Sequence, residues 1–187
     1  MSSLLATKLY RPSVPAKRVQ RLHLIQRLNE GLESGRQMTL VSAPAGFGKT
    51  TCISEWLNGL SFPVAWLSLD ESDNDPVRFF AYYIAALQKV DEHLGREIEG
   101  VLRSGQLPPS EVIGTTLIND ILELESQFLL VLDDFHVIQD HFVLEVMEQI
   151  VVNLFQCQRH LTRPAPRAEH IEWPGCGWLG AVCREYC

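Results

Sequence analysis

Apolar residues recur along this chain with two spacings, which predict an alternation of strands and helices. Apolar runs that are too short for a helix predict buried strands at 38–42, 63–70 and 128–136. Spacings of three and four residues predict helices at about 19–35, 49–58, 76–87, 113–124 and 140–155. Because strands that are apolar on both faces are typical of parallel sheets, the pattern predicts an α/β fold with a parallel sheet flanked by helices.

Turn and capping residues mark the ends of several predicted helices. Gly35 supplies a stop for the first helix, Pro76 suits a first helical turn, and Asp140 can cap the last helix. The first helix has one apolar face, formed by Leu22, Ile25, Leu28 and Leu32. The third helix carries aromatic residues that we expect in the core and at its edge, rather than in a base-stacking platform: Phe79, Phe80, Tyr82 and Tyr83.

The stretch SAPAGFGKTT lies between a predicted strand and a predicted helix and follows the P-loop pattern G-x-x-x-x-G-K-[ST] in relaxed form. Ala43 stands at the first glycine, and Gly48, Lys49 and Thr50 match the rest. Gly46 and Gly48 let backbone N–H groups turn inward around a β-phosphate, and the helix start adds its positive end. Lys49 brings a charge to the β- and γ-phosphates, and the Thr50 hydroxyl can join a Mg²⁺ shell. The alternative is a glycine-rich turn with an ordinary surface lysine.

The run LLVLDD is the second candidate motif, because an acidic pair follows a predicted buried strand. An aspartate at the carboxyl end of such a strand lies at the edge where open α/β sheets bind ligands. Asp133 would hold Mg²⁺, usually through water, and Asp134 could orient an attacking water. A strand-ending acidic pair without a role is the alternative. The two motifs support each other.

Weaker candidates have both a functional and a simpler interpretation. His136 could sense a γ-phosphate or cap a strand. Asp70, Glu71 and Asp73 could face the site, but a turn and helix-start cluster favoured by local backbone hydrogen bonds explains them more simply. Cys52 lies just past the glycine-rich loop and is expected to be a small buried residue.

Charge is unevenly distributed along the 187 residues, whose net charge is −7. Residues 1–36 carry seven basic and two acidic side chains, and residues 37–156 carry five basic and eighteen acidic ones. The acidic body argues against nonspecific binding to nucleic acid, whose phosphates need a basic surface. The basic leader is either a solvated helix or a contact for an anionic ligand. Since no membrane-length apolar run and no secretory signal are present, we expect a cytoplasmic location.

Four stretches together carry a family resemblance: KLYRPSVP, SAPAGFGKTT, VAWLSLDESDNDPVRFFAYYIAAL and FLLVLDDFHVI. Over residues 5 to about 155 the chain resembles the N-terminal nucleotide-binding domain of the large LuxR-type transcriptional activators similar to the maltose regulon activator. These belong to the STAND ATPases. The resemblance implies a P-loop NTPase fold and an ATP switch, in which ADP holds a closed monomer and inducer with ATP opens it to oligomerise. Promoter binding would come from a distant C-terminal helix-turn-helix, so no nucleic-acid contact is expected from this chain.

The resemblance also implies where nucleotide, metal and water would bind. It implies a nucleotide site formed by one continuous loop and two residues before it: Ala43, Pro44, Ala45, Gly46, Phe47, Gly48, Lys49, Thr50, Thr51, Val19 and Arg21. Val19 and Arg21 match the stretch that approaches adenine in the family. Thr50 and Asp133 would hold Mg²⁺, and Asp134 would aid slow hydrolysis. ATP or ADP with Mg²⁺ are therefore the expected cofactors.

The composition changes after Gln156, where the resemblance ends. Four of the five cysteines, two tryptophans and three prolines fall in residues 157–187. This break predicts a tail that is either disordered or the product of a frameshift or truncation. A disulfide framework does not suit a cytosolic chain. A zinc site is a weaker interpretation without a C-x₂-C pair, and its ligands would come from Cys157, Cys176, Cys183, Cys187, His160 and His170.

The tail has a structural consequence for the predicted sheet. In the family, the next strand lies between the P-loop strand and the Asp133 strand and ends in an arginine that senses the γ-phosphate. That strand is expected to be missing here, and Arg163 is at most its vestige. The predicted organisation is an arm and helix at 1–36, a partial P-loop domain at 37–156 and the tail. A sheet incomplete at the C-terminus predicts a marginally stable chain, unless the two strands pair directly.

Three functions stay open on the sequence alone. The first is the ATP-binding part of a signal-transduction transcriptional activator, cut short before its sensor and DNA-binding regions. The second is a P-loop kinase or other metabolic phosphotransferase, and the third is an inactive truncated remnant. As an enzyme, the chain would be at most a slow ATPase. Its expected partners are ATP and, in the full-length form, other copies of itself, with no membrane.

Overall fold

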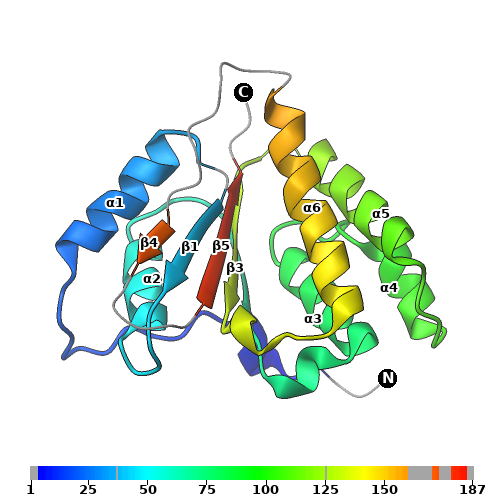
Figure 1. Ribbon diagram of the computed structural model, residues 1–187, viewed down its shortest axis with the longest axis horizontal. Coiled ribbons are helices and arrows are strands. Elements are labelled where there is room, and N and C mark those ends of the chain that lie inside the picture. The colour runs from blue at the N-terminus through cyan, green and yellow to red at the C-terminus, as the bar shows by residue number, and fades with distance from the viewer. Residues whose placement is uncertain (1–3, 37, 125, 160–169, 173–177, 185–187) are drawn as a thin grey trace.

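The computed structural model describes residues 4–36, 38–124, 126–159, 170–172 and 178–184 (Figure 1). Its strands are β1 (Met38–Ser42), β2 (Val64–Ser68), β3 (Phe128–Asp133), β4 (His170–Glu172) and β5 (Trp178–Arg184). Its α-helices are α1 (Leu22–Glu33), α2 (Lys49–Leu57), α3 (Pro76–Leu87), α4 (Arg96–Arg103), α5 (Ser110–Glu123) and α6 (His141–Arg159). Short 3₁₀ helices are η1 (Ala6–Leu9), η2 (Glu71–Asn74) and η3 (Phe135–Val137). None of these described helices is long and apolar enough to cross a membrane.

The described strands form a five-stranded sheet in the order β2-β3-β5-β1-β4. β2 and β3 pair in parallel, as do β1 and β4. β5 lies between β3 and β1 and runs antiparallel to both (Figure 1). The α/β class is therefore confirmed, and the three predicted strands β1, β2 and β3 run parallel to one another. The antiparallel β5 makes the complete sheet mixed, which the prediction of a parallel sheet did not include.

The position of β5 also corrects the prediction that the sheet lacks its central strand. Residues 178–182 pair with β1, and residues 180–184 pair with residues 128–132 of β3. The facing edges of β1 and β3 therefore have backbone partners. The expectation of disorder is wrong for β4 and β5, whereas the frameshift origin of the tail stays a prediction. Arg163 lies outside the described residues.

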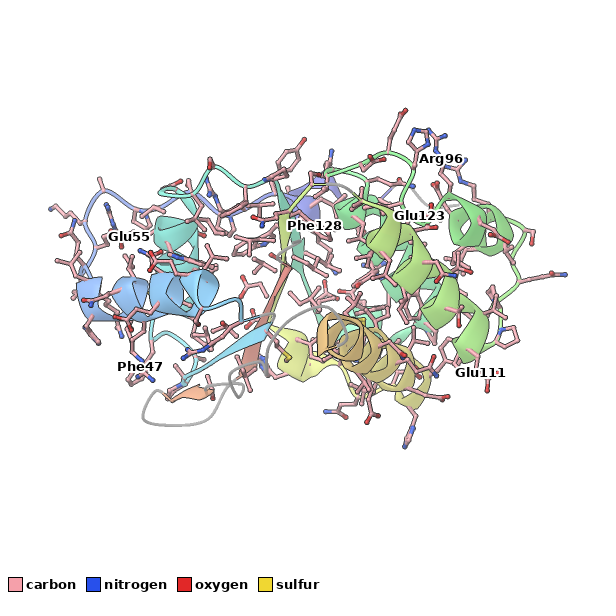
Figure 2. The ribbon with its side chains drawn as sticks, turned by 90° about the horizontal axis from the view of Figure 1, so that it is seen from above. Phe47, Glu55, Arg96, Glu111, Glu123 and Phe128 are labelled. Atoms are coloured by element: carbon pink, nitrogen blue, oxygen red, sulfur yellow. The ribbon has the colours of Figure 1, made fainter. Side chains whose placement is uncertain are left out.

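Helices cover both faces of the sheet, and each face has its own core (Figure 2). α1 and α2 enclose a cluster on one face, and α3, α5 and α6 enclose a larger cluster on the other. Successive residues of a strand point to opposite faces. Accordingly, Leu129 and Val131 of β3 join the first cluster, and Leu130 and Leu132 join the second. This two-sided burial is the physical reason for the continuous apolar run in the sequence.

Two helices differ from their predictions. Leu24 and Leu28 bury the apolar face of α1, whereas Leu22 is 67% exposed at the first position of the helix. Leu22 of the predicted apolar face therefore does not take part in the buried contact of the helix. α4 has no counterpart among the predicted helices, because only Ile98 and Leu102 are buried in an otherwise polar segment.

A buried ion-pair cluster fastens the N-terminal arm to the loop after β2. Lys8 Nζ contacts Asp73 Oδ2 and lies 2.8 Å from Asp70 Oδ2. Arg78 Nε lies 3.1 Å from Asp73 Oδ1, so both oxygens of the fully buried Asp73 are engaged. Asp70 and Asp73 also form a capping box at η2. The predicted helix-start cluster is thus confirmed for Asp70 and Asp73. Their ion pairs with Lys8 also join this loop to the N-terminal arm.

Candidate functional site

The loop from Ala43 to Gly48 joins the carboxyl end of β1 to the start of α2. Gly46 and Gly48 have φ angles of 82° and 77°, in the left-handed region that favours glycine. Phe47 N–H donates to Pro44 O at 3.3 Å, which closes a turn at the tip of the loop. The loop therefore has a backbone path that needs glycine at two of its positions.

Backbone amides at the start of α2 lie next to this loop. The first backbone hydrogen bond of the helix runs from Cys52 N–H to Gly48 O at 2.9 Å. The amides of Lys49, Thr50 and Thr51 precede it and have no partner within the helix. Together with the positive end of the helix dipole, these N–H groups form a site suited to an anion such as phosphate.

The side chain of Lys49 lies inside the loop. Its Nζ donates to Ala43 O at 2.8 Å and to Pro44 O at 3.4 Å. Since Lys49 is only 7% exposed, the alternative of an ordinary surface lysine is excluded. An ammonium group has three N–H donors, so one of them can face an anion held by the loop.

Thr50 joins the loop to the second motif. Its hydroxyl Oγ1 lies 3.0 Å from each carboxylate oxygen of Asp133 and donates to them. The backbone of Asp133 is fixed in turn, because its carbonyl accepts from Leu69 N–H at 3.0 Å. The structure thus brings together two motifs that are 83 residues apart in the sequence. Hydroxyl and carboxylate oxygens are ligands that suit Mg²⁺.

The surroundings of Asp133 raise the pKa of its carboxyl group from the ordinary 3.8 to about 6. Burial is the largest cause, since the residue is 4% exposed, and the charge of Asp134 adds to it. The hydrogen bond from Thr50 and the charge of Lys49 act in the opposite direction. A cation beside this carboxylate would stabilise its ionised form.

Asp134 has a left-handed backbone conformation, with φ 59° and ψ 32°. No other non-glycine residue in the described ranges has a positive φ. Aspartate tolerates this conformation better than most residues, and such outliers cluster at functional sites. Its half-exposed side chain places Oδ1 3.8 Å from Nδ1 of His136. Asp134 and His136 therefore lie beside the buried Asp133, where solvent reaches them.

A pocket of about 220 Å³ lies between the N-terminal arm and the glycine-rich loop. Its lining includes six predicted nucleotide-site residues: Val19, Arg21, Gly46, Phe47, Gly48 and Thr51. Arg18 and Glu55 also line it, and Arg18 Nη2 lies 2.9 Å from Glu55 Oε1. The structure therefore brings Val19 and Arg21 to the same pocket as residues of the loop.

Sequence reasoning missed the pair formed by Arg18 and Glu55. Arg18 belongs to the arm and Glu55, labelled in Figure 2, belongs to α2, and only the fold shows that they meet. The spacing of Thr51, Cys52 and Glu55 on one face of α2 is the one signal that could have found Glu55. Cys52 is buried as predicted, and burial raises the pKa of its thiol while the charge of Arg21 opposes this.

Several other predicted residues lie away from this pocket. Asp70, Glu71 and Asp73 do not line it, and Asp73 is bound to Lys8 and Arg78 instead. Within the described part of the chain, no group of three or more histidine, cysteine or acidic side chains could hold a metal ion. The side chains of the possible zinc ligands lie outside the described residues: Cys157, Cys176, Cys183, Cys187, His160 and His170.

Together, these residues fit a magnesium nucleotide. Amides and one lysine supply donors for phosphate, and Gly46 and Gly48, both at positive φ, bring no side chain into the turn. Thr50 and Asp133 supply two oxygen ligands. Two protein ligands suffice for Mg²⁺, which keeps several waters and takes the rest from phosphate.

The chain is similar to two kinds of known protein. It is 35% identical over 144 residues to "HTH-type transcriptional regulator MalT" of Serratia proteamaculans, and 31% identical over 144 residues to MalT of Klebsiella pneumoniae. It is also 35% identical over 140 residues to "Serine/threonine-protein kinase PknK" of Mycobacterium tuberculosis. No family model matches the chain.

These similarities cover most of this chain but little of each relative. The matches to MalT span 77% of this chain and 16% of the regulator, and the match to PknK spans 72% of this chain and 12% of the kinase. The chain therefore resembles a segment that a transcriptional regulator and a protein kinase both contain. The similarity supports relation to MalT and leaves the activity of the whole protein to be proposed.

Proposed function

We propose that this chain is the ATP-binding switch segment of a MalT-like transcriptional regulator. The observation that carries the proposal is the contact between Thr50 and Asp133, which joins a glycine-rich loop to an acidic strand end. Each residue alone has a simpler explanation. Their meeting at the start of α2, beside the buried Lys49, favours a site for Mg²⁺ and a nucleotide phosphate.

The proposed roles follow from the surroundings of each side chain. The amides of Ala45 to Thr51 and the Lys49 ammonium would bind phosphate, with Val19 and Arg21 on the adenine side of the pocket. Thr50 and Asp133 would hold Mg²⁺, which neutralises charge on the phosphate oxygens. Asp134 would accept a hydrogen bond from a water and orient it for slow hydrolysis.

The rest of the regulator would supply what this chain does not. By its relation to MalT, we assign the segment to the LuxR-type STAND ATPases with a P-loop NTPase fold, working in the cytoplasm. DNA binding would belong to another region, since residues 37–156 carry eighteen acidic and only five basic side chains. Exchange of ADP for ATP would control self-association of the full-length form.

A nucleotide titration tests the proposal. Fluorescent ADP is added to the 187-residue chain, with and without Mg²⁺, and to Lys49→Ala, with Lys89→Ala as an exposed control. We expect saturable uptake that needs Mg²⁺ and weakens about tenfold or more in Lys49→Ala, since a charge-assisted hydrogen bond is lost. Uptake with steady phosphotransfer to a small molecule would favour a phosphotransferase. A folded chain without uptake would favour an inactive remnant.

A further inference from the structure

Asn74 ends η2 and ties the loop after β2 to the segment after β3. Its Nδ2 donates to Val137 O at 2.9 Å and to Glu71 O at 3.1 Å. Its Oδ1 accepts from Gln139 N–H at 2.6 Å and from Asp140 N–H at 3.0 Å. A carboxamide has two N–H donors and one oxygen with two lone pairs, so these four contacts use its full capacity.

The segment that Asn74 holds begins at Asp134. Val137, whose carbonyl accepts from Asn74, donates its own N–H to Asp134 O at 3.1 Å. The Asn74 side chain is therefore linked to the backbone of Asp134 by hydrogen bonds through a single residue, Val137. Because Asp134 is in the left-handed region, its conformation depends on the structure around it.

The same loop also holds the other end of this segment. Leu69 N–H donates to Asp133 O at 3.0 Å, where β2 and β3 end side by side. Residues 133–140, which we call the acidic corner, are thus fixed by Leu69 at one end and by Asn74 at the other. Asp134 and His136 lie between the two points of attachment.

Asn74 is itself held in place by its neighbour. Asp73 is fully buried and is bound by Lys8 and Arg78. The capping box of η2 adds a hydrogen bond from Asp70 N–H to Asp73 Oδ2 at 2.8 Å. The loop after β2 is therefore held in place, and the hydrogen bonds of Asn74 hold the acidic corner against this loop.

From these contacts we propose that Asn74 is a positioning residue for hydrolysis, which holds the acidic corner so that Asp134 faces the reacting phosphate. The inference rests on the proposed function, because it assigns Asp134 to the attacking water. Asn74 acts through Val137 and does not touch the nucleotide. A displacement of about 1 Å in a group that orients a reactant lowers a rate by about 100-fold in unfavourable cases.

Two substitutions separate the contacts of Asn74. Asn74→Ala removes all four hydrogen bonds. Asn74→Asp keeps an oxygen for Gln139 and Asp140, but it replaces the donor to Val137 and Glu71 with a second acceptor, which repels their carbonyl oxygens. Asn153→Ala is the control, because Asn153 is an exposed residue of α6 that bonds only within its helix. Both Asn74 variants should have larger effects than the control, because each loses the two hydrogen bonds that Asn74 donates.

Three measurements on the 187-residue chain test the proposal. Hydrogen exchange without nucleotide follows the amides of residues 134–140, fluorescent ADP with Mg²⁺ reports affinity, and single-turnover hydrolysis of ATP reports the chemical step. In Asn74→Ala we expect exchange of the acidic corner to accelerate at least tenfold with β3 unchanged. ADP affinity should stay within twofold, and hydrolysis should slow about tenfold or more.

The other possible outcomes would contradict either the role of Asn74, the role of Asp134 or the proposed nucleotide binding. Unchanged exchange in Asn74→Ala would show that Asn74 does not hold the acidic corner. Parallel loss of affinity, hydrolysis and melting temperature would show a merely structural role. A wild-type chain that binds ADP without hydrolysing ATP would remove the role of Asp134 and with it this inference. A wild-type chain that binds no nucleotide would instead refute the proposed function, while the exchange result would still report on the corner.

Discussion

Replacing Asp133 with asparagine separates two effects of its carboxylate: the proposed binding of Mg²⁺, and the cost in stability of a buried negative charge. Asp133 is 4% exposed, and burial raises its pKa from 3.8 to about 6. At pH 7.5 the carboxylate is ionised in the folded and in the unfolded chain, but ionisation costs more in the folded one. Without Mg²⁺ and nucleotide, the ionised Asp133 side chain therefore lowers the stability of the folded chain.

The size of this effect follows from the pKa difference. A rise of about two units corresponds to about 3 kcal/mol at a pH above both values. Between pH 3.8 and about 6 the folded chain binds more protons than the unfolded chain, so stability falls as pH rises through this window and is constant above it. The carboxamide introduced by Asp133→Asn would not titrate, and its carbonyl oxygen can still accept from Thr50. We expect Asp133→Asn to be more stable by up to about 3 kcal/mol at pH 7.5 and by about half of that at pH 5.0.

Urea unfolding in EDTA at the two pH values measures both numbers. Glu148→Gln on the exposed side of α6 controls for the loss of one negative charge. The same Asp133→Asn chain should lose the Mg²⁺ dependence of ADP uptake, because a carboxylate ligand is gone. A gain in stability that is equal at both pH values, or no gain at all, would refute the reasoning about burial.

Two further predictions concern parts of the chain away from the loop. Lys8→Ala leaves the buried Asp73 with Arg78 alone and should cost about 3–5 kcal/mol in urea unfolding, with Lys89→Ala near wild type. A cost below about 1 kcal/mol would contradict a buried anchor. In a chain ending at residue 159, β1 and β3 lose β5 as their pairing partner at five positions each. At about 1 kcal/mol for each lost hydrogen bond, the free energy of unfolding falls by about 10 kcal/mol, which is the whole stability of a typical domain. This shortened chain should show no cooperative thermal transition, whereas a chain ending at residue 184 should.

Much of this fold is predictable from the sequence because its signals are local. The glycine-rich loop, the strand before it and the helix after it form one continuous stretch. The strand β3 can be recognised in the sequence by its apolar run at residues 128–132, all of which are buried. Asp140 caps α6 as predicted, with Val143 N–H 3.0 Å from its Oδ1. Local chemistry decides each of these features.

The features that the sequence did not predict depend on contacts between distant segments. The contacts of Lys8 with Asp73 and of Arg18 with Glu55 each join the arm to a segment far along the chain. The strand β5 is not predicted, because the unusual composition of the tail masks the apolar run WLGAVC inside it. Sheet order and strand direction are likewise set by long-range pairing, which periodicity does not encode.

Amide chemical shifts test the proposed phosphate site most directly, because the phosphate would lie against the backbone of one loop. In ¹H–¹⁵N spectra of the 187-residue chain, titration with ADP and Mg²⁺ should move the amide signals of Gly46, Gly48 and Thr50 most strongly. Lys49→Ala should strongly reduce these changes at the same sub-saturating nucleotide concentration. Changes centred elsewhere in the chain, or equal changes in the lysine variant, would contradict a phosphate site at the start of α2.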